Sequence, residues 1–480
     1  MSQEPTQVEE QKPPFPPSEV NAKKALIAIG IGVLISFIPA PEGLTPQSMR
    51  YLGIFIFMIV GMLTSIAQTW AVTTFAAFVC IILKMAPLNT LFSEFSGTTI
   101  WMLLAVVGFA GCMQESGLMK RIALLVLKFF PPNFVGQVLA LLSACTVVNP
   151  IIPSSTAKLA MMSPLTGTVI QEAGLKPHSK GAKGLWFVMW VTVYLGAATF
   201  LTGSNITLIL LAMLPIEVSS HFTWMNWFLA GIPWGIPLLV LTALYVIFFL
   251  RPEEKTSMTK ETMQNQFKAL GPMSPAEQFC LIVLVITVGM WITNDVHGIH
   301  SSVVSWLALF AMYCRGLFST RDVVAKFPWA LVMMFGPMMG VVALLKPMGI
   351  IDWVAALLPA DLIRSMIPNA FVFVLILSIV SCLLRFVIDQ LSMIPIILAI
   401  FGPIATILGI NYWVILFVMW ANAHTWPLPH HGVMIMQSFA MMGGDLLELE
   451  DVTYLTWVYS AITCISCLIA VPFWSMLGLL

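Results

Sequence analysis

Charged residues are scarce in this chain of 480 residues, because only 9% of them are Asp, Glu, Lys or Arg. Soluble domains average about a quarter. Long apolar stretches such as LLVLTALYVIFFL (238–250) and CISCLIAVPFWSMLGLL (464–480) approach the roughly 20 residues that cross a bilayer. The shortage of charge excludes a soluble globular domain, and the apolar stretches predict an all-α polytopic protein surrounded by membrane lipid.

A net charge is also absent. The 22 Lys and Arg residues balance the 22 Asp and Glu residues, so no bulk electrostatic attraction to nucleic acid is expected. The eight cysteines lie in apolar segments, and we interpret them as small buried hydrophobic residues. Residues 1–22 are polar, acidic and rich in proline, which predicts a disordered cytosolic tail rather than a signal peptide.

Apolar blocks divide the rest of the chain. We predict about 11 transmembrane helices and two re-entrant hairpins, because the blocks 134–172 and 366–408 are each interrupted midway by polar or proline-bearing sequence. The predicted order is a first transmembrane helix in 23–48, an N-terminal repeat in 49–250, a cytosolic linker in 251–276 and a C-terminal repeat in 277–480.

Basic residues are distributed unequally between the two sides of these helices. With the N-terminus inside, the clusters around Lys120, Lys180 and Lys255 all reach the cytosol, and few basic residues reach the other side. The positive-inside rule therefore predicts a multi-pass protein of the cell membrane, most simply a bacterial inner membrane. Its N-terminus would be cytosolic and its C-terminus external.

The two halves of the chain resemble each other faintly. Gly108 lies nine residues before Gly117 ahead of the first hairpin, and Gly340 lies nine before Gly349 ahead of the second. A broken span follows each hairpin, FLTGSNITLILLAML in the first half and ANAHTWPLPHHGVMIM in the second. An odd number of crossings separates corresponding elements, so the repeats are inverted. This pattern is typical of secondary transporters with a binding site near the membrane midplane.

The interruption in the first hairpin reads NPIIPSSTAKLAMMSPL (149–165). Unpaired backbone groups are costly in lipid, so such a break is tolerated only where protein or a water-filled cavity satisfies it. Pro150 and Pro153 remove N–H donors and stop a helix at the tip. The break therefore predicts a polar binding site inside the membrane.

Hydroxyl groups follow that break. Ser154, Ser155 and Thr156 supply side-chain donors. The helix predicted to begin at Ala157 directs its positive N-terminal end at them, which suits an anion. Carbonyl groups of the same tip could also coordinate a cation such as sodium, so Pro150, Ser154 and Ser155 are candidates for an ion-coupling site as well.

The segment LTGSN in the following span repeats this pattern. Gly203 permits an unwound turn, and Ser204 and Asn205 supply polar groups before a fresh helix. Taken singly, each break also fits ordinary helix packing and hydroxyl back-bonding. Two breaks in the same half favour a site for a charged ligand.

Four stretches carry a family resemblance: GLTPQSMRYLGIFIFMIVGML, FSGTTIWMLLAVVGFAGCMQESGLMKRIALLVL, NPIIPSSTAKLAMMSPL and TFLTGSNITLILLAMLP. They resemble the divalent-anion:sodium symporter family, and most closely its bacterial citrate/tartrate/succinate exchanger and plastid dicarboxylate-translocator branch. The resemblance implies an elevator-type transporter that forms a homodimer. It also implies that a Ser-Asn-Thr tip on each hairpin holds substrate carboxylates, with sodium sites beside it.

On this pattern the first tip is 154–156, with Ser155 in place of the family's Asn. The resemblance implies that residues 203–205 close the first sodium and substrate site. Lys158 lies where the exchanger branch often has a basic residue, although its side chain could also extend toward the cytosol.

The second hairpin departs from the pattern. The first tip lies a fixed number of residues before Pro164. Counting back the same number from Pro403 places Met393-Ile394-Pro395 at the second tip, and none of these three residues has a hydroxyl. The polar residues near this predicted tip are Asp389, Gln390 and Ser392.

Arg385 and Asp389 are four residues apart and share one helix face. Ionisable residues at membrane depth are costly, so the default interpretation is functional. Either the two form an ion pair that holds the hairpin, or they act in transport. In the second case either Arg385 contacts the anion, or Asp389 binds the coupling cation or proton.

The second broken span is rich in polar residues and prolines. We expect Thr425, Pro429, His430 and His431 to face substrate, because the family closes its second site here. The two adjacent histidines could hydrogen-bond an anion and respond to pH, or serve helix packing. A metal site that combines them with His424 is a weaker interpretation, because proline-broken backbone gives the three no regular spacing.

Together these features predict a secondary active transporter of small organic dianions such as succinate, malate, tartrate or citrate, and not an enzyme. The sequence leaves three modes of coupling open: sodium symport, proton coupling and anion exchange. Sodium would be a coupling ion in the first of these, and no other cofactor is expected. The alternatives are a transporter of a sulfonate or inorganic anion, a cation/proton antiporter, an integral-membrane enzyme and a channel.

Overall fold

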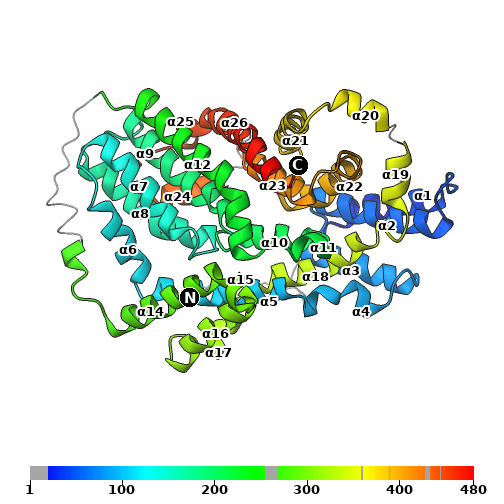
Figure 1. The fold of residues 1–480 in the computed structure, drawn as a ribbon, viewed down its shortest axis with the longest axis horizontal. Coiled ribbons are helices and arrows are strands. Elements are labelled where there is room, and N and C mark those ends of the chain that lie inside the picture. Colours follow the sequence, from blue (N-terminus) through cyan, green and yellow to red (C-terminus); the bar gives the residue numbers. More distant parts are fainter. Residues whose placement is uncertain (1–19, 254–266, 358–359, 389, 427–432, 444) are drawn as a thin grey trace, which may run out of the picture.

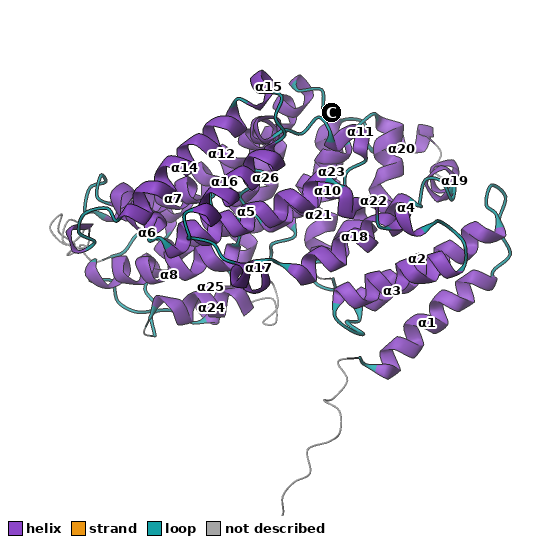
Figure 2. Ribbon diagram, turned by 90° about the horizontal axis from the view of Figure 1, so that it is seen from below, coloured by secondary structure: helices purple, strands orange, loops and turns teal. Residues whose placement is uncertain are grey.

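The computed structural model describes residues 20–253, 267–357, 360–388, 390–426, 433–443 and 445–480. Within these ranges every regular element is a helix, which confirms the predicted all-α membrane fold (Figure 2). The helices of the first half are α1 (Ala22–Phe37), α2 (Pro46–Leu63), α3 (Thr69–Ile82), α4 (Leu88–Leu91), α5 (Thr98–Glu115), α6 (Leu118–Leu127), α7 (Phe134–Val148), α8 (Ser155–Glu172), α9 (Lys180–Trp190), α10 (Asn205–Met213), α11 (Ile216–Ser219) and α12 (Trp224–Phe249). Those of the second half are α14 (Pro275–Ile292), α15 (Asn294–His297), α16 (Ser301–Cys314), α17 (Thr320–Lys326), α18 (Trp329–Ala343), α19 (Ile350–Leu357), α20 (Ala360–Met366), α21 (Ala370–Leu384), α22 (Gln390–Leu408), α23 (Tyr412–Asn422), α24 (Val433–Met442), α25 (Leu449–Thr453) and α26 (Leu455–Met476).

Six of the described segments are long and apolar enough to cross a membrane unaided, namely α2, α5, α12, α14, α22 and α25 with α26. Two further pairs, α17 with α18 and α20 with α21, reach that length together but bend by 64° and 85° at their junctions. Other apolar helices, such as α7 and α23, are shorter. Because the backbone groups at a short helix end cannot face lipid, these ends must be satisfied inside the protein.

The two hairpins begin in the same way. Asn133 caps α7 by accepting a hydrogen bond from Gly136 N at 2.7 Å, and Asn369 caps α21 by accepting one from Val372 N at 3.0 Å. The asparagine in each case satisfies an N–H that the helix itself leaves free.

A glycine turns the chain sharply ahead of each hairpin. Gly117 has φ +84° and Gly349 has φ +72°, and each directly precedes a short helix, α6 or α19. A side chain is strained in this left-handed region, so glycine suits both turns. The second glycine of each pair noted in the sequence thus has the same structural role in both halves.

The first hairpin breaks where the sequence predicts it. α7 ends at Val148 and α8 begins at Ser155, so residues 149–154 form the tip. Ser154 caps α8, because its Oγ accepts a hydrogen bond from Ala157 N at 3.2 Å. The helix starts two residues earlier than predicted, since this hydroxyl satisfies one of its first N–H groups.

The second hairpin breaks earlier than predicted. α21 ends at Leu384 and α22 begins at Gln390, so the break lies between them. Residues 393–395 lie inside α22 and are buried, and their assignment to the tip is wrong. Counting back from proline fails because Pro164 and Pro403 lie at different distances from the starts of their helices.

Each hairpin packs against the broken span of its own half, α7 and α8 against α9, and α21 and α22 against α23. The two spans meet, because α10 contacts α23. Figures 1 and 2 both place α7 and α8 toward one end of the molecule and α1, α2 and α3 toward the other, with α23 between them. The described residues at the two breaks, 201–204 and 423–426, are buried.

Candidate functional site

The first hairpin tip is bonded directly to the unwound part of the following span. The backbone N–H of Asn205 donates to the carbonyl of Pro153 at 3.0 Å, and the Thr202 hydroxyl donates to the carbonyl of Pro150 at 2.6 Å. Trp224 Nε1 donates in turn to the Thr202 hydroxyl at 3.0 Å. Two breaks that are far apart in the sequence thus satisfy each other's backbone groups.

Lys158 lies at the centre of this junction and is completely buried. Its ammonium donates to Asn149 Oδ1 at 3.0 Å and to the carbonyl of Gly203 at 2.7 Å. The interpretation that the side chain extends toward the cytosol is therefore wrong. No ion pair found in the described part of the chain includes Lys158, so its partners are neutral oxygens.

Glycine is required at position 203. A Cβ there would lie 2.1 Å from the carbonyl oxygen of Ala197, a backbone atom that cannot move aside cheaply. The chain at 200–204 has left the helix, and the turn is so tight that backbone fills the space of a side chain. This close approach directs the carbonyl of Gly203 at Lys158.

The predicted polar residues surround this junction. Ser155 is half-buried and Thr156 is exposed in the first turn of α8. Ser204 caps α10, because its Oγ accepts a hydrogen bond from Ile206 N at 3.2 Å. The side-chain oxygen of Asn205 is buried and finds no hydrogen-bond partner among the described residues.

A turn of π-helix (Val191–Leu195) follows α9, and the sequence patterns gave no sign of it. Such turns are rare and often mark functional sites. The backbone carbonyl of Thr192 accepts a hydrogen bond from Asn149 Nδ2 at 2.7 Å, and the ring of Tyr194 contacts that of His424, with centroids 5.0 Å apart. The π-turn therefore connects the first hairpin tip with the break in the second span.

In the second half, an amide takes the place of the ammonium. Gln390 Nε2 donates to the carbonyl of Ala423 at 2.9 Å, which ties the start of α22 to the second broken span. Arg385 lies at the break of the hairpin, where its Nη1 donates to the carbonyl of Ile388 at 3.0 Å. Ser392 is buried inside α22.

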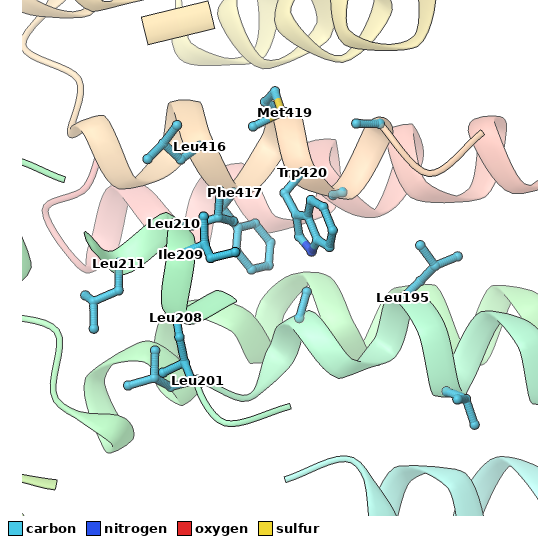
Figure 3. Packing of buried hydrophobic residues seen from close by; sticks show 14 of the residues in the cluster. Leu195, Leu201, Leu208, Ile209, Leu210, Leu211, Leu416, Phe417, Met419 and Trp420 are labelled. Carbon is cyan, nitrogen blue, oxygen red and sulfur yellow. The ribbon is translucent and has the colours of Figure 1, made fainter. Parts of the chain in front are cut away.

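The end of α23 carries two buried polar side chains. Thr425 is 4% exposed, and its hydroxyl has no partner in the described structure. His424 is equally buried, and its Nδ1 lies 2.7 Å from the carbonyl of Trp420. Figure 3 shows Trp420 projecting from α23 toward the segment that carries Leu195 and Leu201.

Several predicted residues cannot be placed. Asp389, Pro429, His430 and His431 lie outside the described residues, so the Arg385–Asp389 pair and the histidine contacts stay predictions. Across the ranges that the structure describes, no three His, Cys, Asp or Glu side chains are arranged to hold a metal ion. The described site is therefore built from neutral polar groups and one buried lysine, with Arg385 at the second hairpin.

Known proteins resemble this chain over most of its length. It is 24% identical over 410 residues to a citrate/succinate antiporter of Escherichia coli (strain K12), which covers 79% of this chain and 83% of the relative. It is 23% identical over 343 residues to a putative malate transporter, YflS, of Bacillus subtilis (strain 168), covering 70% and 72%. It is 25% identical over 352 residues to the chloroplastic dicarboxylate transporter 2 of Spinacia oleracea, covering 71% and 62%.

Solved structures share the fold at lower identity. The YdaH transporter of Alcanivorax borkumensis superimposes with a TM-score of 0.54 at 15% identity, covering 81% of this chain and 88% of that one. The MtrF protein of Neisseria gonorrhoeae superimposes with a TM-score of 0.57 at 12% identity, covering 93% of this chain and 97% of that one. At these identities the likeness concerns the fold alone.

A family model decides the class of protein. The model described as "Sodium:sulfate symporter transmembrane region" matches residues 19–480. It describes transporters, so the interpretation as an integral-membrane enzyme is wrong. With nearly its whole length matched, the chain belongs to the sodium:sulfate symporter family.

Proposed function

We propose that this protein is a secondary active transporter that exchanges small organic dianions, di- or tricarboxylates, across the cell membrane. The observation that carries this proposal is the ammonium of Lys158, which is buried between the first hairpin tip and the first broken span and contacts neutral oxygens.

A buried charge without a counter-charge is strongly unfavourable, and ionisable groups at membrane depth usually belong to a substrate pathway. Lys158 is held by Asn149 and Gly203, and the hydroxyls of Ser155 and Thr156 lie in the adjacent turn of α8. A carboxylate bound at this tip would compensate the ammonium and accept hydrogen bonds from these hydroxyls. The site therefore suits an anion and disfavours a cation as the transported species.

The same lysine favours exchange over sodium symport. A carbonyl and an amide oxygen, the ligands of Lys158, are groups that a sodium ion could also use. The protonated side chain of Lys158 supplies their positive partner from the protein itself, so no sodium is needed to make the site attractive to an anion. An empty site would keep an uncompensated charge, and this charge would oppose the movement of the carrier without substrate.

The named relatives support this substrate class. Two of them are described as a citrate/succinate antiporter and a dicarboxylate transporter. The family model refers to sulfate, so an inorganic dianion is the second candidate.

We also propose an arrangement in the membrane. The N-terminus is cytosolic and the C-terminus external, in a bacterial inner membrane, and the hairpins move as an elevator against the remaining helices. The protein acts as a homodimer. An apolar hollow of about 470 Å³, lined by α5, α16, α17 and α18, offers one surface for pairing.

Counterflow in proteoliposomes tests the proposal. Vesicles loaded with unlabelled malate should take up labelled malate or succinate without sodium and without a pH gradient, whereas empty vesicles should not. Citrate, tartrate, sulfate and a sulfonate complete the panel. Uptake into empty vesicles that depends on a sodium gradient would overturn exchange, and counterflow with sulfate alone would replace the carboxylates by an inorganic anion.

A further inference from the structure

Four buried polar atoms without a partner gather where the two broken spans meet. They are the indole nitrogens of Trp190 and Trp420, Nε2 of His424 and the hydroxyl of Thr425. None of these atoms has a hydrogen-bond partner within the described ranges. Buried polar groups are nearly always paired in folded proteins, so each exception requires an explanation.

The rings that carry three of these atoms form one continuous cluster. The ring of His424 lies edge-on to the indole of Trp420, with centroids 3.9 Å apart, and edge-on to Tyr194 at 5.0 Å. Tyr194 stacks on Trp190 at 4.8 Å. The cluster thus spans the π-turn of the first span and the end of α23. In Figure 3 the nitrogen of Trp420 lies on the side of the ring that faces the first span.

The chemistry of the unpaired atoms is specific. A backbone carbonyl can only accept, so the contact of His424 Nδ1 with the carbonyl of Trp420 at 2.7 Å places a proton on Nδ1. In the neutral ring, Nε2 is then an acceptor and needs a donor on a ligand. The two indoles are donors only, and the hydroxyl of Thr425 can donate or accept.

We propose that this cluster is the subsite for the hydroxylated end of a 2-hydroxydicarboxylate, the class of malate and tartrate. The indole N–H groups of Trp190 and Trp420 donate to the distal carboxylate, and Nε2 of His424 accepts a hydrogen bond from the substrate hydroxyl. The hydroxyl of Thr425 completes the subsite. This inference rests on the proposed transport function, because Lys158 and the first tip hold the other carboxylate.

The subsite also accounts for the second hairpin. Its buried residues 393–395 carry no side-chain donor, so they cannot supply hydrogen bonds of the kind that the hydroxyls of the first tip provide. The aromatic cluster supplies donors from the broken spans instead. Arg385 lies at the break of this hairpin, where its Nη1 donates to the carbonyl of Ile388, and its positive charge favours a bound carboxylate nearby.

A site with a buried acceptor rejects a ligand that lacks the matching donor, because the acceptor then stays unpaired. The wild-type protein should therefore bind malate about tenfold or more tightly than succinate, which lacks the hydroxyl. Competition by each dianion against labelled malate in the counterflow assay measures the two affinities. Thermal shift of the purified protein provides a binding readout that does not depend on transport.

Three variants separate the proposed contacts. His424→Phe removes the acceptor nitrogen but keeps an aromatic ring at this position. The preference for malate over succinate should therefore fall to within about twofold, while the affinity for succinate changes little. His424→Asn retains an acceptor and should keep part of the preference. Trp420→Phe removes a carboxylate donor and should weaken malate and succinate equally, by about fivefold.

Trp413→Phe is the matched control. Trp413 also lies on α23 with a buried, unpaired indole nitrogen in the described structure, but it stacks on Phe417 and Phe222 away from the break. This variant should bind both dianions as the wild type does. Equal wild-type affinities for malate and succinate, or equal loss of both in His424→Phe, would overturn the subsite. Failure of every carboxylate in the panel, citrate and tartrate included, to bind the wild-type protein would instead refute the proposed function.

Discussion

The two hairpins are joined to their broken spans by the same kind of bond but with a different charge. In the first, the ammonium of Lys158 donates to the carbonyl of Gly203, and in the second, the amide of Gln390 donates to the carbonyl of Ala423. Both side chains come from the first turn of the returning helix. Either donor satisfies a carbonyl freed by the break, but only the lysine adds charge.

The difference indicates that the halves have different tasks. A neutral bond is sufficient to hold a hairpin against its span, so the extra charge in the first half has to serve something else. The two hairpin tips also differ in polarity. Hydroxyl-bearing residues lie at the first tip, whereas buried apolar residues follow the second break. We interpret the first half as the principal anion site and the junction of the two broken spans, with His424 and Trp420 of the second half, as the part that selects among anions.

The largest effect should come from removing the charge. Lys158→Ala should lower dicarboxylate counterflow by roughly 100-fold or more, because it deletes the buried cation that compensates the substrate. Gln390→Ala should lower it by about threefold to tenfold, since only a neutral hydrogen bond is lost. Counterflow of labelled malate in proteoliposomes measures both.

The lysine variant also allows a sharper test of exchange. Without the ammonium, Asn149 Oδ1 and the carbonyl of Gly203 could coordinate a free cation, so residual transport by Lys158→Ala should become dependent on sodium. Wild-type counterflow should be indifferent to sodium. Comparable losses in Lys158→Ala and Gln390→Ala would contradict the division of tasks between the halves.

The second largest effect concerns the backbone of the first break. Gly203→Ala would place a Cβ 2.1 Å from the carbonyl of Ala197, so we expect a destabilisation of about 1–3 kcal/mol and a loss of counterflow. Gly289→Ala is the matched control, because nothing lies within 4 Å of a Cβ at that helical position. Thermal unfolding in detergent measures both variants. A Gly203→Ala protein as stable as Gly289→Ala would show that the first break is not tightly built.

Much of the first site could be predicted from the sequence. Pro150, Pro153 and Gly203 are residues whose effect on the backbone is local, so they located both breaks of the first half. The position of Lys158 could not be predicted in this way. Its burial depends on the carbonyl of Gly203, which only the packing of α8 against the unwound span brings within reach.

The second half was harder to predict because its signals are less local. Prolines occur inside α22 rather than at its start, so they misplaced the tip. The π-turn and the aromatic cluster gave no periodic pattern, since they arise from contacts between spans that are distant in the sequence. Sequence patterns report breaks in the chain well, and contacts across the breaks poorly.

Two orphaned polar atoms offer a third, smaller test of the comparison. Asn205 and Thr425 lie at the breaks of the first and second spans, and the side-chain oxygen of each is buried without a partner among the residues described. If substrate supplies the missing partner, Asn205→Ala and Thr425→Val should each weaken dicarboxylate binding by about fivefold to 20-fold. Thermal shift with malate measures this. Thr207→Val, which removes a hydroxyl satisfied by Leu201 and Ser204, should destabilise the protein without such a selective loss of affinity.

The smallest effect tests a contact between the halves outside the site. His178 Nδ1 lies 2.5 Å from Asp451 Oδ2, and this hydrogen bond raises the pKa of His178 above its ordinary value. The contact is therefore fully stabilising below about pH 6.5, the usual histidine pKa, and is lost as pH rises through the raised value. The wild type should melt above His178→Gln at pH 6 and converge with it near pH 9. Lys183→Gln removes a different ion-pair partner of Asp451 and leaves the His178–Asp451 contact in place, so its difference in melting temperature from the wild type should be the same at pH 6 and at pH 9. A constant difference between wild type and His178→Gln would mean that the histidine acts by packing, and that the halves are joined chiefly through the site itself.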